Sequence, residues 1–209
     1  LADAKFFWDK DKSKNLIKQI AKLKDVKFYE GLGSVYDKTQ RLRKLSGMLA
    51  DEFNLNKEKA EIAASISKSD LCSDLVNEYP DLQGLLGKYF ALSQGFEEDV
   101  SNAVSDHYLP LGNNSMTSKK PISYIVAISD KIDTLVGFFL INEKPTSSKD
   151  PFALRRSAIG LLRTIIDNKL NLKLRNLISY NIKLLEEQGV RKTNDCLLYT
   201  SPSPRDRQE

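Results

Sequence analysis

The sequence predicts an all-α protein, and three observations support that prediction. Apolar residues recur at helical spacing along nearly all of the 209 residues. Residues that favour helix caps and turns divide these apolar runs into segments of ordinary helical length. The sequence contains no internal repeat and no series of strand-like segments. A multi-helix domain around one core is the architecture that fits this pattern.

The first 33 residues are predicted to form an N-terminal helical segment with a connector. Residues 3–24 place apolar side chains at helical spacing among charged ones, so we expect a helix there. Residues 26–32 are rich in β-branched and aromatic residues, and Gly31 and Gly33 interrupt them, which favours an extended connector. Because the sequence opens without methionine inside a predicted helix, we expect it to be a piece of a longer chain.

Polar caps mark the helices that follow the connector. Ser34 is expected to cap a helix that runs to about Phe53. Asn56 is expected to cap a second helix over 57–66, and Glu58 in its first turn suits the positive end of the helix dipole.

Three shorter helices are expected next. Ser69 or Asp70 opens the first of them, which ends before Pro80. Asp81 is expected to cap the second, and the third covers 96–108.

An apolar helix over 122–139 is expected at the centre of the fold, after a flexible loop over 112–120. It is too apolar for a surface helix, so we expect neighbours on more than one side. Asp130, Lys131 and Asp133 interrupt the apolar run, and charges at that depth argue against a membrane span. The apolar residues of this helix are Ile122, Ile125, Val126, Ile132, Leu135, Val136 and Phe139.

A polar elbow over 142–150 joins this helix to the next one. Asp150 is expected to be the N-cap and Pro151 the first helical residue, because the missing N–H of proline would be unpaired there anyway. A final helix is expected over 172–188. The helix after the elbow is expected to bury Leu154, Ala158, Leu161 and Ile165 and to turn Arg155, Arg156 and Arg163 outward.

Residues 34–194 are assigned to one helical domain, and residues 195–209 to a tail. The tail has no helical period, and the alternation of Ser and Pro over 201–204 prevents regular structure. A disordered tail is one interpretation. We favour another, because CLLYTSPSPRDRQ resembles a translated sequencing adaptor. The natural sequence would then be lost after about Asn194.

Composition is typical of a soluble globular protein, with 41% hydrophobic and 29% charged residues. A net charge of +4 and a pI near 8.9 permit a nucleic-acid partner without demanding one. The two cysteines, Cys72 and Cys196, have no disulfide or metal spacing, which indicates a reducing cytoplasm. The sequence shows no signal peptide or membrane-spanning stretch, so we expect a cytoplasmic protein.

Aspartates at helix centres suggest the architecture of HD phosphohydrolases, whose metal site uses several His and Asp residues from separate helices. This sequence has one histidine, His107. Ser67 and Lys68 occupy the positions expected for the His-Asp pair, and Asp130 stands at the late position. Two remaining groups do not hold a catalytic metal. We therefore expect an HD-like domain without an intact metal site and without a bound metal.

Structural roles account for the residues that remain at these positions. His107 is expected to form local hydrogen bonds beside Tyr108, near a helix end. Asp130 and Asp133 are expected to bind a neighbouring helix cap or a basic side chain. The sequence contains no glycine-rich phosphate loop and no nucleophile–base pair, so these patterns predict no catalytic residue.

Six stretches carry a more specific signal, and they occur in uninterrupted order over about residues 1–190. They are DAKFFWDKD, KFYEGLGSVYDKTQRL, ISKSDLCSDLVNEYPDLQGLLGKYFAL, AVSDHYLP, AISDKIDTLVGFF and KPTSSKDPFALRRSAIGLLR. Together they resemble the beta subunit of bacterial glycyl-tRNA synthetase. In that family these segments form an HD-like helical domain in the middle of a longer chain, with an anticodon-binding region after it.

The resemblance implies a glycine–tRNA ligase that is a heterotetramer of alpha and beta subunits. The alpha subunit is implied to hold the class II active site for glycine, ATP and magnesium, so no cofactor is expected on this chain. The beta subunit is implied to bind tRNA(Gly). No residue of this chain is then expected to be catalytic.

The role implied for this domain is to position tRNA, because attachment of glycine requires the end of the tRNA to be brought to the activated amino acid. Lys and Arg side chains that lie along the phosphate backbone fix its register. The helix N-terminus at Pro151 would add positive potential. Lys38 and Lys68 are weaker candidates, because they can simply fill the vacated metal pocket. The candidate tRNA-binding residues are Lys119, Lys120, Lys144, Lys149, Arg155 and Arg156.

Three alternatives stay open at this point. Arg155 or Arg156 can instead pair with Asp130 or Asp133 and hold the elbow together. The domain can be a structural scaffold that joins parts of the synthetase without contacting tRNA. It can also be an HD-type metal phosphohydrolase, although the single histidine argues against that function.

Overall fold

The computed structural model describes residues 2–112, 114–146 and 149–191, and helices dominate these parts of the chain. They contain ten α-helices, three short 3₁₀ helices and one two-stranded hairpin. The all-α prediction is therefore confirmed, with the hairpin as an addition. The predicted tail, 195–209, lies outside the described residues.

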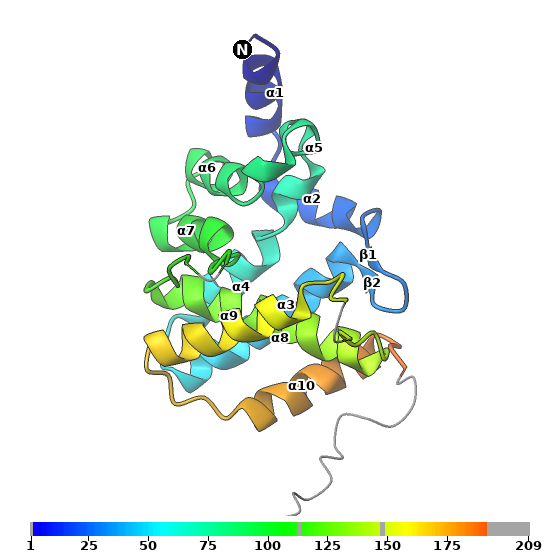
Figure 1. Cartoon of the computed structure of the whole chain (residues 1–209). Helices are drawn as coiled ribbons and strands as arrows, with labels where there is room; N and C mark the ends of the chain where they lie inside the picture. Colours follow the sequence, from blue (N-terminus) through cyan, green and yellow to red (C-terminus); the bar gives the residue numbers. More distant parts are fainter. Residues whose placement is uncertain (1, 113, 147–148, 192–209) are drawn as a thin grey trace, which may run out of the picture.

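Helix α8 (Pro121–Leu140) is the centre of the fold, as predicted (Figure 1). Ile125 and Ile128 in its middle have no exposed surface. No helix in the described ranges combines the length and apolarity that crossing a lipid bilayer requires. The helices that contact α8 are α3 (Val35–Glu52), α4 (Lys57–Ile66), α7 (Glu98–Asp106), α9 (Leu154–Asp167) and α10 (Leu174–Glu187).

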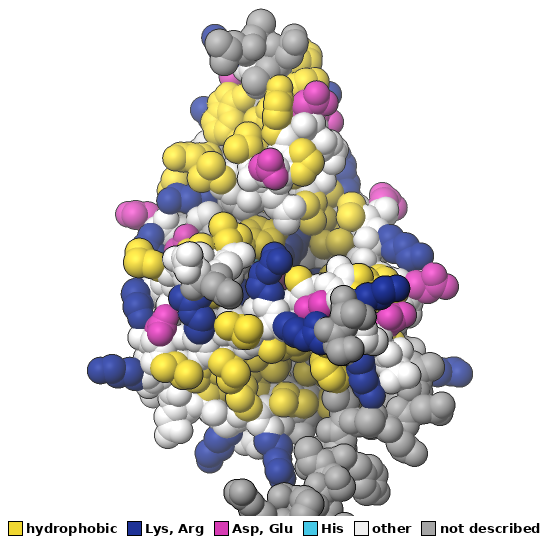
Figure 2. Space-filling view, viewed as in Figure 1, with side chains coloured by type: hydrophobic (Ala, Val, Ile, Leu, Met, Phe, Trp, Pro, Cys, Tyr) yellow, Lys and Arg dark blue, Asp and Glu magenta, His cyan; other side chains and the backbone are white. Residues whose placement is uncertain are grey.

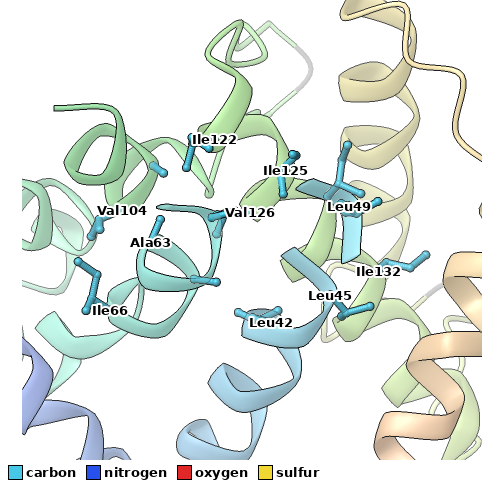
Figure 3. Close-up of a cluster of buried hydrophobic side chains, with 14 of the residues drawn as sticks. Leu42, Leu45, Leu49, Ala63, Ile66, Val104, Ile122, Ile125, Val126 and Ile132 are labelled. Atoms are coloured by element: carbon cyan, nitrogen blue, oxygen red, sulfur yellow. The ribbon is translucent and has the colours of Figure 1, made fainter. Parts of the chain in front are cut away.

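Apolar side chains from α8 and from three of its neighbours, α3, α4 and α7, converge on one core (Figure 3). Removal of this apolar surface from water is the main favourable term in folding. Leu42, Leu45 and Leu49 come from α3, at the three- and four-residue spacing that keeps them on one helix face. The other labelled members are Ala63 and Ile66 of α4, Val104 of α7, and Ile122, Ile125, Val126 and Ile132 of α8.

The predicted caps of α3 and α4 are confirmed. The hydroxyl of Ser34 accepts a hydrogen bond from the backbone N–H of Asp37 (3.2 Å), and the Asp37 carboxylate accepts one from the Ser34 N–H (2.8 Å). This reciprocal pair is a capping box. The side chain of Asn56 accepts from the N–H of Lys59 at 2.9 Å. Local sequence therefore fixes the start of both helices.

The prediction of a single helix over 3–24 is wrong, because the helix is interrupted before Asn15. Helix α1 (Ala2–Lys12) is followed by α2 (Leu16–Ile20) and a 3₁₀ helix, η1 (Ala21–Lys24). The Asn15 side chain caps α2 by accepting from the N–H of Lys18 at 3.0 Å. The side chain of Gln94 accepts from the N–H of Leu16, whose side chain is 2% exposed. Tertiary burial of Leu16 thus outweighs the continuous helical pattern.

The predicted extended connector forms a small hairpin. Strand β1 (Lys27–Tyr29) pairs antiparallel with β2 (Gly33–Ser34). Gly33 has a φ of +81°, and an added Cβ there would lie 2.6 Å from the Asp37 carboxylate. Glycine is therefore required where the hairpin turns into the capped start of α3.

The segment between α4 and α7 differs from the prediction in where its helices begin. A 3₁₀ helix, η2 (Ser69–Cys72), precedes α5 (Asp74–Glu78), and Ser73 is the cap of α5. The predicted cap Asp81 instead lies inside the 3₁₀ helix η3 (Pro80–Leu82). Helix α6 (Leu85–Ser93) begins after Gly84, whose N–H donates to the buried Asp70 carboxylate at 2.6 Å. That long-range bond sets the start of α6, and local sequence does not reveal it.

Candidate functional site

Three of the four positions predicted to be remnants of a metal site meet in the structure. Lys68 follows α4, His107 ends α7, and Asp130 lies in the middle of α8. The Lys68 ammonium is 2.8 Å from His107 Nε2 and 3.2 Å from Asp130 Oδ2. The fourth residue, Ser67, is buried, and its hydroxyl donates to the carbonyl of Ala64 at 2.8 Å. Ser67 therefore belongs to its own helix end and not to this site.

The contacts of His107 define its tautomer. A lysine ammonium only donates hydrogen bonds, so Nε2 of His107 must accept from Lys68. The proton then sits on Nδ1, which donates to the carbonyl of Val104 at 2.8 Å. Burial, together with the Lys68 ammonium, holds the pKa of His107 well below its ordinary value. The ring lies against Tyr108, with 3.8 Å between centroids, so the predicted local role of His107 is confirmed.

Helix α3 adds two cations that face the two aspartates of α8. The Lys38 ammonium is 3.0 Å from Asp130 Oδ1 and 3.2 Å from Asp133 Oδ2. Arg41 binds the Asp133 carboxylate with two nitrogens, Nε at 2.7 Å and Nη2 at 3.0 Å. We call the set Lys38, Arg41, Lys68, His107, Asp130 and Asp133 the buried charge cluster.

Sequence analysis did not identify Arg41 as a member of this cluster. One signal was available, because Lys38 and Arg41 have the same three-residue spacing as Asp130 and Asp133. Two such pairs on facing helices can align charge against charge. The predicted roles of Asp130 and Asp133, as partners of basic side chains, are confirmed.

Both carboxylates of the cluster are ionised. Burial alone would raise the pKa of Asp130, but the ammonium groups of Lys38 and Lys68 hold that pKa well below its ordinary value. Burial likewise acts to raise the pKa of Asp133, and Arg41 and Lys38 hold it below the usual value. Because desolvated charges need partners, the cluster ties α3, α7 and α8 together around fixed ion pairs.

This arrangement does not suit a divalent metal. The atoms that a metal would need, the Asp130 oxygens and His107 Nε2, are already bound by ammonium groups. No group of three or more His, Cys, Asp or Glu side chains is close enough to hold a metal ion anywhere in the described residues. The cluster therefore gives no support to an HD-type phosphohydrolase.

The helix after the elbow begins later than predicted. It starts at Leu154, and Ala153 before it has a left-handed φ of +52°, so Pro151 is not its first residue. The Asp150 carboxylate still caps the helix, because it accepts from the backbone N–H groups of Leu154 (2.8 Å) and Arg155 (3.0 Å). Asp150 thus already occupies the helix N-terminus that was expected to attract a phosphate.

The two arginines at the start of α9 face different partners. The Arg155 guanidinium donates to the carbonyl of Thr146, across the elbow. Arg155 therefore helps to hold the elbow, although not by the predicted pairing with Asp130 or Asp133. Arg156 is exposed and lies at the rim of a hollow beside Asp130. The described part of the chain contains no ion pair between either arginine and these two aspartates.

The six candidate residues fall into two groups at opposite ends of α9. Lys119 donates to the carbonyl of Asp167, the last residue of α9, at 2.5 Å, and Lys120 is its neighbour. Thirteen residues of helical rise, about 20 Å, separate that end from the start of α9. The expectation that all six gather around the elbow is therefore wrong. The group that does gather there is Lys144, Lys149, Arg155 and Arg156, which we call the basic elbow.

The basic elbow is open to solvent. Lys149, Arg155 and Arg156 are exposed, and Lys144 is half-buried. Figure 2 shows Lys and Arg side chains around this segment, on the same face as α9. In the described residues no acidic side chain forms an ion pair with any of the four. The elbow therefore presents several positive charges that a polyanion can reach.

Apolar side chains form a second exposed feature beside the elbow. Ile159, Leu162 and Ile166 lie on one outer face of α9 and are 49%, 48% and 71% exposed. Figure 2 shows the resulting band of apolar side chains over α9. Leu111 and Met116 are 66% and 82% exposed on the loop that Arg163 fastens to this helix.

Comparison with known proteins gives one consistent family. A family model described as "Glycyl-tRNA synthetase beta subunit" matches residues 1–201. A glycine–tRNA ligase beta subunit from Phenylobacterium zucineum is 41% identical over 203 residues, covering 91% of this chain and 30% of that relative. Beta subunits from Rhodospirillum centenum and Acidithiobacillus ferrooxidans are 44% and 45% identical and cover 83% and 80% of this chain. The chain spans 24–30% of the length of these relatives.

Proposed function

Because the chain belongs to the glycyl-tRNA synthetase beta subunit family, we propose that it helps a glycine–tRNA ligase to bind and position tRNA. The reaction attaches glycine to tRNA(Gly) and converts ATP to AMP and pyrophosphate. The partner in this proposal is an alpha subunit, which carries the chemical site. The contribution of the present domain is orientation of the tRNA, which lowers the barrier by fixing the geometry in advance.

One observation supports a tRNA-binding role for the basic elbow. Its cationic side chains are accessible and have no acidic partner in the described residues, whereas the cations of the buried charge cluster are all paired. Phosphate contacts need accessible, unneutralised Lys or Arg side chains. Lys38 and Lys68 are buried and form ion pairs with Asp130, so they do not contribute to this surface.

The test is a charge-removal series in the full-length beta subunit assembled with its alpha subunit. Lys144→Gln, Lys149→Gln, Arg155→Gln and Arg156→Gln are made singly and together, with Lys183→Gln on the exposed side of α10 as the control. Each lost phosphate contact should weaken tRNA affinity and reduce the salt dependence by roughly one unit of log–log slope. ATP–pyrophosphate exchange should be unchanged, because that chemistry belongs to the other subunit.

The combined variant decides the question. Unchanged tRNA affinity and unchanged salt slope in that variant would remove the tRNA-binding role from the elbow. The melting temperature of Arg155→Gln must also be measured, because the Arg155 guanidinium donates a hydrogen bond to the carbonyl of Thr146. A fall in its melting temperature without a change in slope would assign Arg155 a purely structural role.

A scaffold function is the second candidate, and the exposed apolar face of α9 favours it. Three large aliphatic side chains in a row on one helix face are a typical protein contact surface. The curated relatives have more than two-thirds of their length outside the part matched here. We therefore propose that another region of the beta-subunit chain covers this face.

A single charged substitution tests the scaffold function. Ile166→Asp in the full-length beta subunit should lower the melting temperature, because it would place a carboxylate in an apolar contact. Ile17→Asp is the control, because Ile17 is 56% exposed but lies on α2, away from this face. Equal melting temperatures for the two variants and the wild type would show that the α9 face stays uncovered.

A further inference from the structure

A hollow opens where the start of α9 faces the middle of α8 and the turn after α7. Its volume is about 220 Å³, below the range of pockets for drug-sized ligands, roughly 300–1,000 Å³. It is lined by residues that include Tyr108, Leu111, Asp130, Lys131, Arg156 and Ser157. The hollow thus adjoins the buried charge cluster on its outer side.

Two of the lining residues are cations that form no ion pair with an acidic side chain in the described ranges of the chain. The Lys131 ammonium donates to two neutral groups, the backbone carbonyls of His107 (3.2 Å) and Leu109 (2.6 Å). Lys131 is 8% exposed, and its stem is confined by Gly160 of α9, where an added Cβ would lie 3.0 Å from Lys131 Cε. Arg156 is exposed at the rim. Burial, with a smaller effect of the Lys68 and Lys38 charges, lowers the pKa of Lys131 to about 8.

The one acidic residue in the lining is already neutralised from inside the protein. Asp130 receives Lys38 at 3.0 Å and Lys68 at 3.2 Å. Behind it, Arg41 and Lys38 share Asp133. Five cations (Lys38, Arg41, Lys68, Lys131 and Arg156) therefore lie around Asp130 and Asp133. The buried Asp70 near Lys68 adds one further carboxyl, and His107 is neutral. The surplus positive charge faces the hollow through Lys131 and Arg156.

The donors that line the hollow match an oxyanion. Arg156 offers a planar fork of N–H donors, and Lys131 has one N–H left after its two carbonyl bonds. Ser157 adds a hydroxyl. We propose that this hollow binds a phosphate group, which Arg156 and Lys131 hold by charge-assisted hydrogen bonds with Ser157 as a further donor.

The hollow lies beside the basic elbow, so we infer that the phosphate it binds belongs to the tRNA backbone. This identification rests on the proposed function. Arg156 belongs to both the hollow and the basic elbow, so a strand that follows Lys149 and Arg155 can place its next phosphate in the hollow. A free phosphate or nucleotide offers the same chemistry. The two sources are separated by the experiment below.

The experiment uses the full-length beta subunit with its alpha subunit and inorganic phosphate as the probe, titrated at constant ionic strength with chloride. Arg156→Gln should weaken phosphate binding by about tenfold or more. Arg175→Gln is the matched control, because Arg175 is an exposed arginine on α10 that does not line the hollow, and it should stay within about twofold of wild type. Lys131→Met, which keeps the volume of the stem, should also weaken binding.

The outcomes separate this inference from the proposed function. The phosphate site would be overturned if phosphate binds no more tightly than chloride. It would also be overturned if the wild type and Arg156→Gln bind phosphate with equal affinity. If phosphate does not bind while the other elbow variants still weaken tRNA binding, the tRNA function stands and the phosphate site fails. If Arg156→Gln weakens phosphate binding and also lowers the tRNA salt slope, the source is the tRNA. If it weakens phosphate binding alone, the site stands and its ligand is a free phosphate.

Discussion

The buried charge cluster and the basic elbow differ in how their positive charges are stabilised. In the cluster, Lys38, Arg41 and Lys68 are less than 10% exposed, and each binds a carboxylate within 3.2 Å. In the elbow, Lys149 and Arg156 are exposed and water solvates their charges. Desolvation is expensive, so a buried cation needs a fixed partner and an exposed one does not. The comparison separates structural charges from charges that are available to a ligand.

The strongest test of this comparison removes a buried carboxylate. Asp133→Ala leaves Arg41 without its bidentate partner and Lys38 with Asp130 alone, at positions with almost no exposed surface. We expect the free energy of unfolding to fall by about 3–5 kcal/mol, measured by urea denaturation. The exposed pair of Lys57 and Asp51 provides the control, and Asp51→Ala should change stability little. Similar losses for the two variants would break the distinction between paired core charges and solvated surface charges.

A second test uses the neutral state of His107, the one histidine of the sequence. Its pKa in the folded protein is well below 6.5, so only the unfolded chain takes up a proton as pH falls through that value. The free energy of unfolding should therefore fall between about pH 6.5 and pH 5, by up to about 1.4 kcal/mol per pH unit. Asp130 and Asp133, whose pKa values are lowered, should lose their contribution only in more acidic solution.

His107→Gln is the matched variant for this pH test, because its amide can accept from Lys68 and does not titrate. Its stability should be flat between about pH 6.5 and pH 5, where the wild type loses stability. The measurement is urea denaturation at several pH values. A wild type without any slope in this window would mean that His107 is protonated in the folded protein, which the Lys68 contact forbids.

Sequence patterns predicted the parts of this fold that depend on local chemistry. Ser34 and Asn56 are caps because their side chains bind amides three residues ahead, so neighbours in sequence suffice. The apolar run of α8 predicted its burial for a similar reason. Residue types also predicted an HD-like domain without an intact metal site, and the part of the chain that the structure describes holds no metal-binding cluster.

The errors concern contacts between distant segments. Arg41 was missed because its partner Asp133 is 92 residues away. Lys119 was grouped with the elbow, but it binds the far end of α9, 48 residues ahead of it. The start of α9 was misplaced because Asp150 caps it from four residues upstream, past a left-handed Ala153. Long-range packing decides such details, and the spacing of residue types does not carry them.

Asp150 lies in the elbow, but its carboxylate should contribute to stability, as the carboxylates of the buried charge cluster do. Its carboxylate accepts from the N–H groups of Leu154 and Arg155. Asp150→Ala should cost about 1 kcal/mol, the usual effect of removing a helix cap, measured as a shift in urea midpoint. Asp150→Asn keeps a capping oxygen but removes the charge. It should preserve most of the stability and strengthen tRNA binding, and a loss of stability equal to that of alanine would show that the charge is what caps α9.

The smallest expected effect on stability belongs to Lys149→Gln. Lys149 is exposed, and its hydrogen bonds in the described residues come from its backbone: the N–H donates to the Thr146 hydroxyl at 3.2 Å, and the carbonyl accepts from the Thr146 N–H at 2.9 Å. The melting temperature of the assembled synthetase should therefore be unchanged. The log–log salt slope of tRNA binding should nevertheless fall by roughly one unit, because one phosphate contact and its released counterion are lost.

Lys119→Gln is the counterpart of this variant at the other end of α9. Its ammonium is held by the carbonyl of Asp167, about 20 Å of helix away from the elbow. We expect the tRNA salt slope of Lys119→Gln to equal that of the wild type. If Lys119→Gln lowers the slope and Lys149→Gln does not, the tRNA follows the C-terminal end of α9. The elbow would then be a solvated loop whose exposed charges bind nothing, and exposure without an acidic partner would not be enough to identify a phosphate contact.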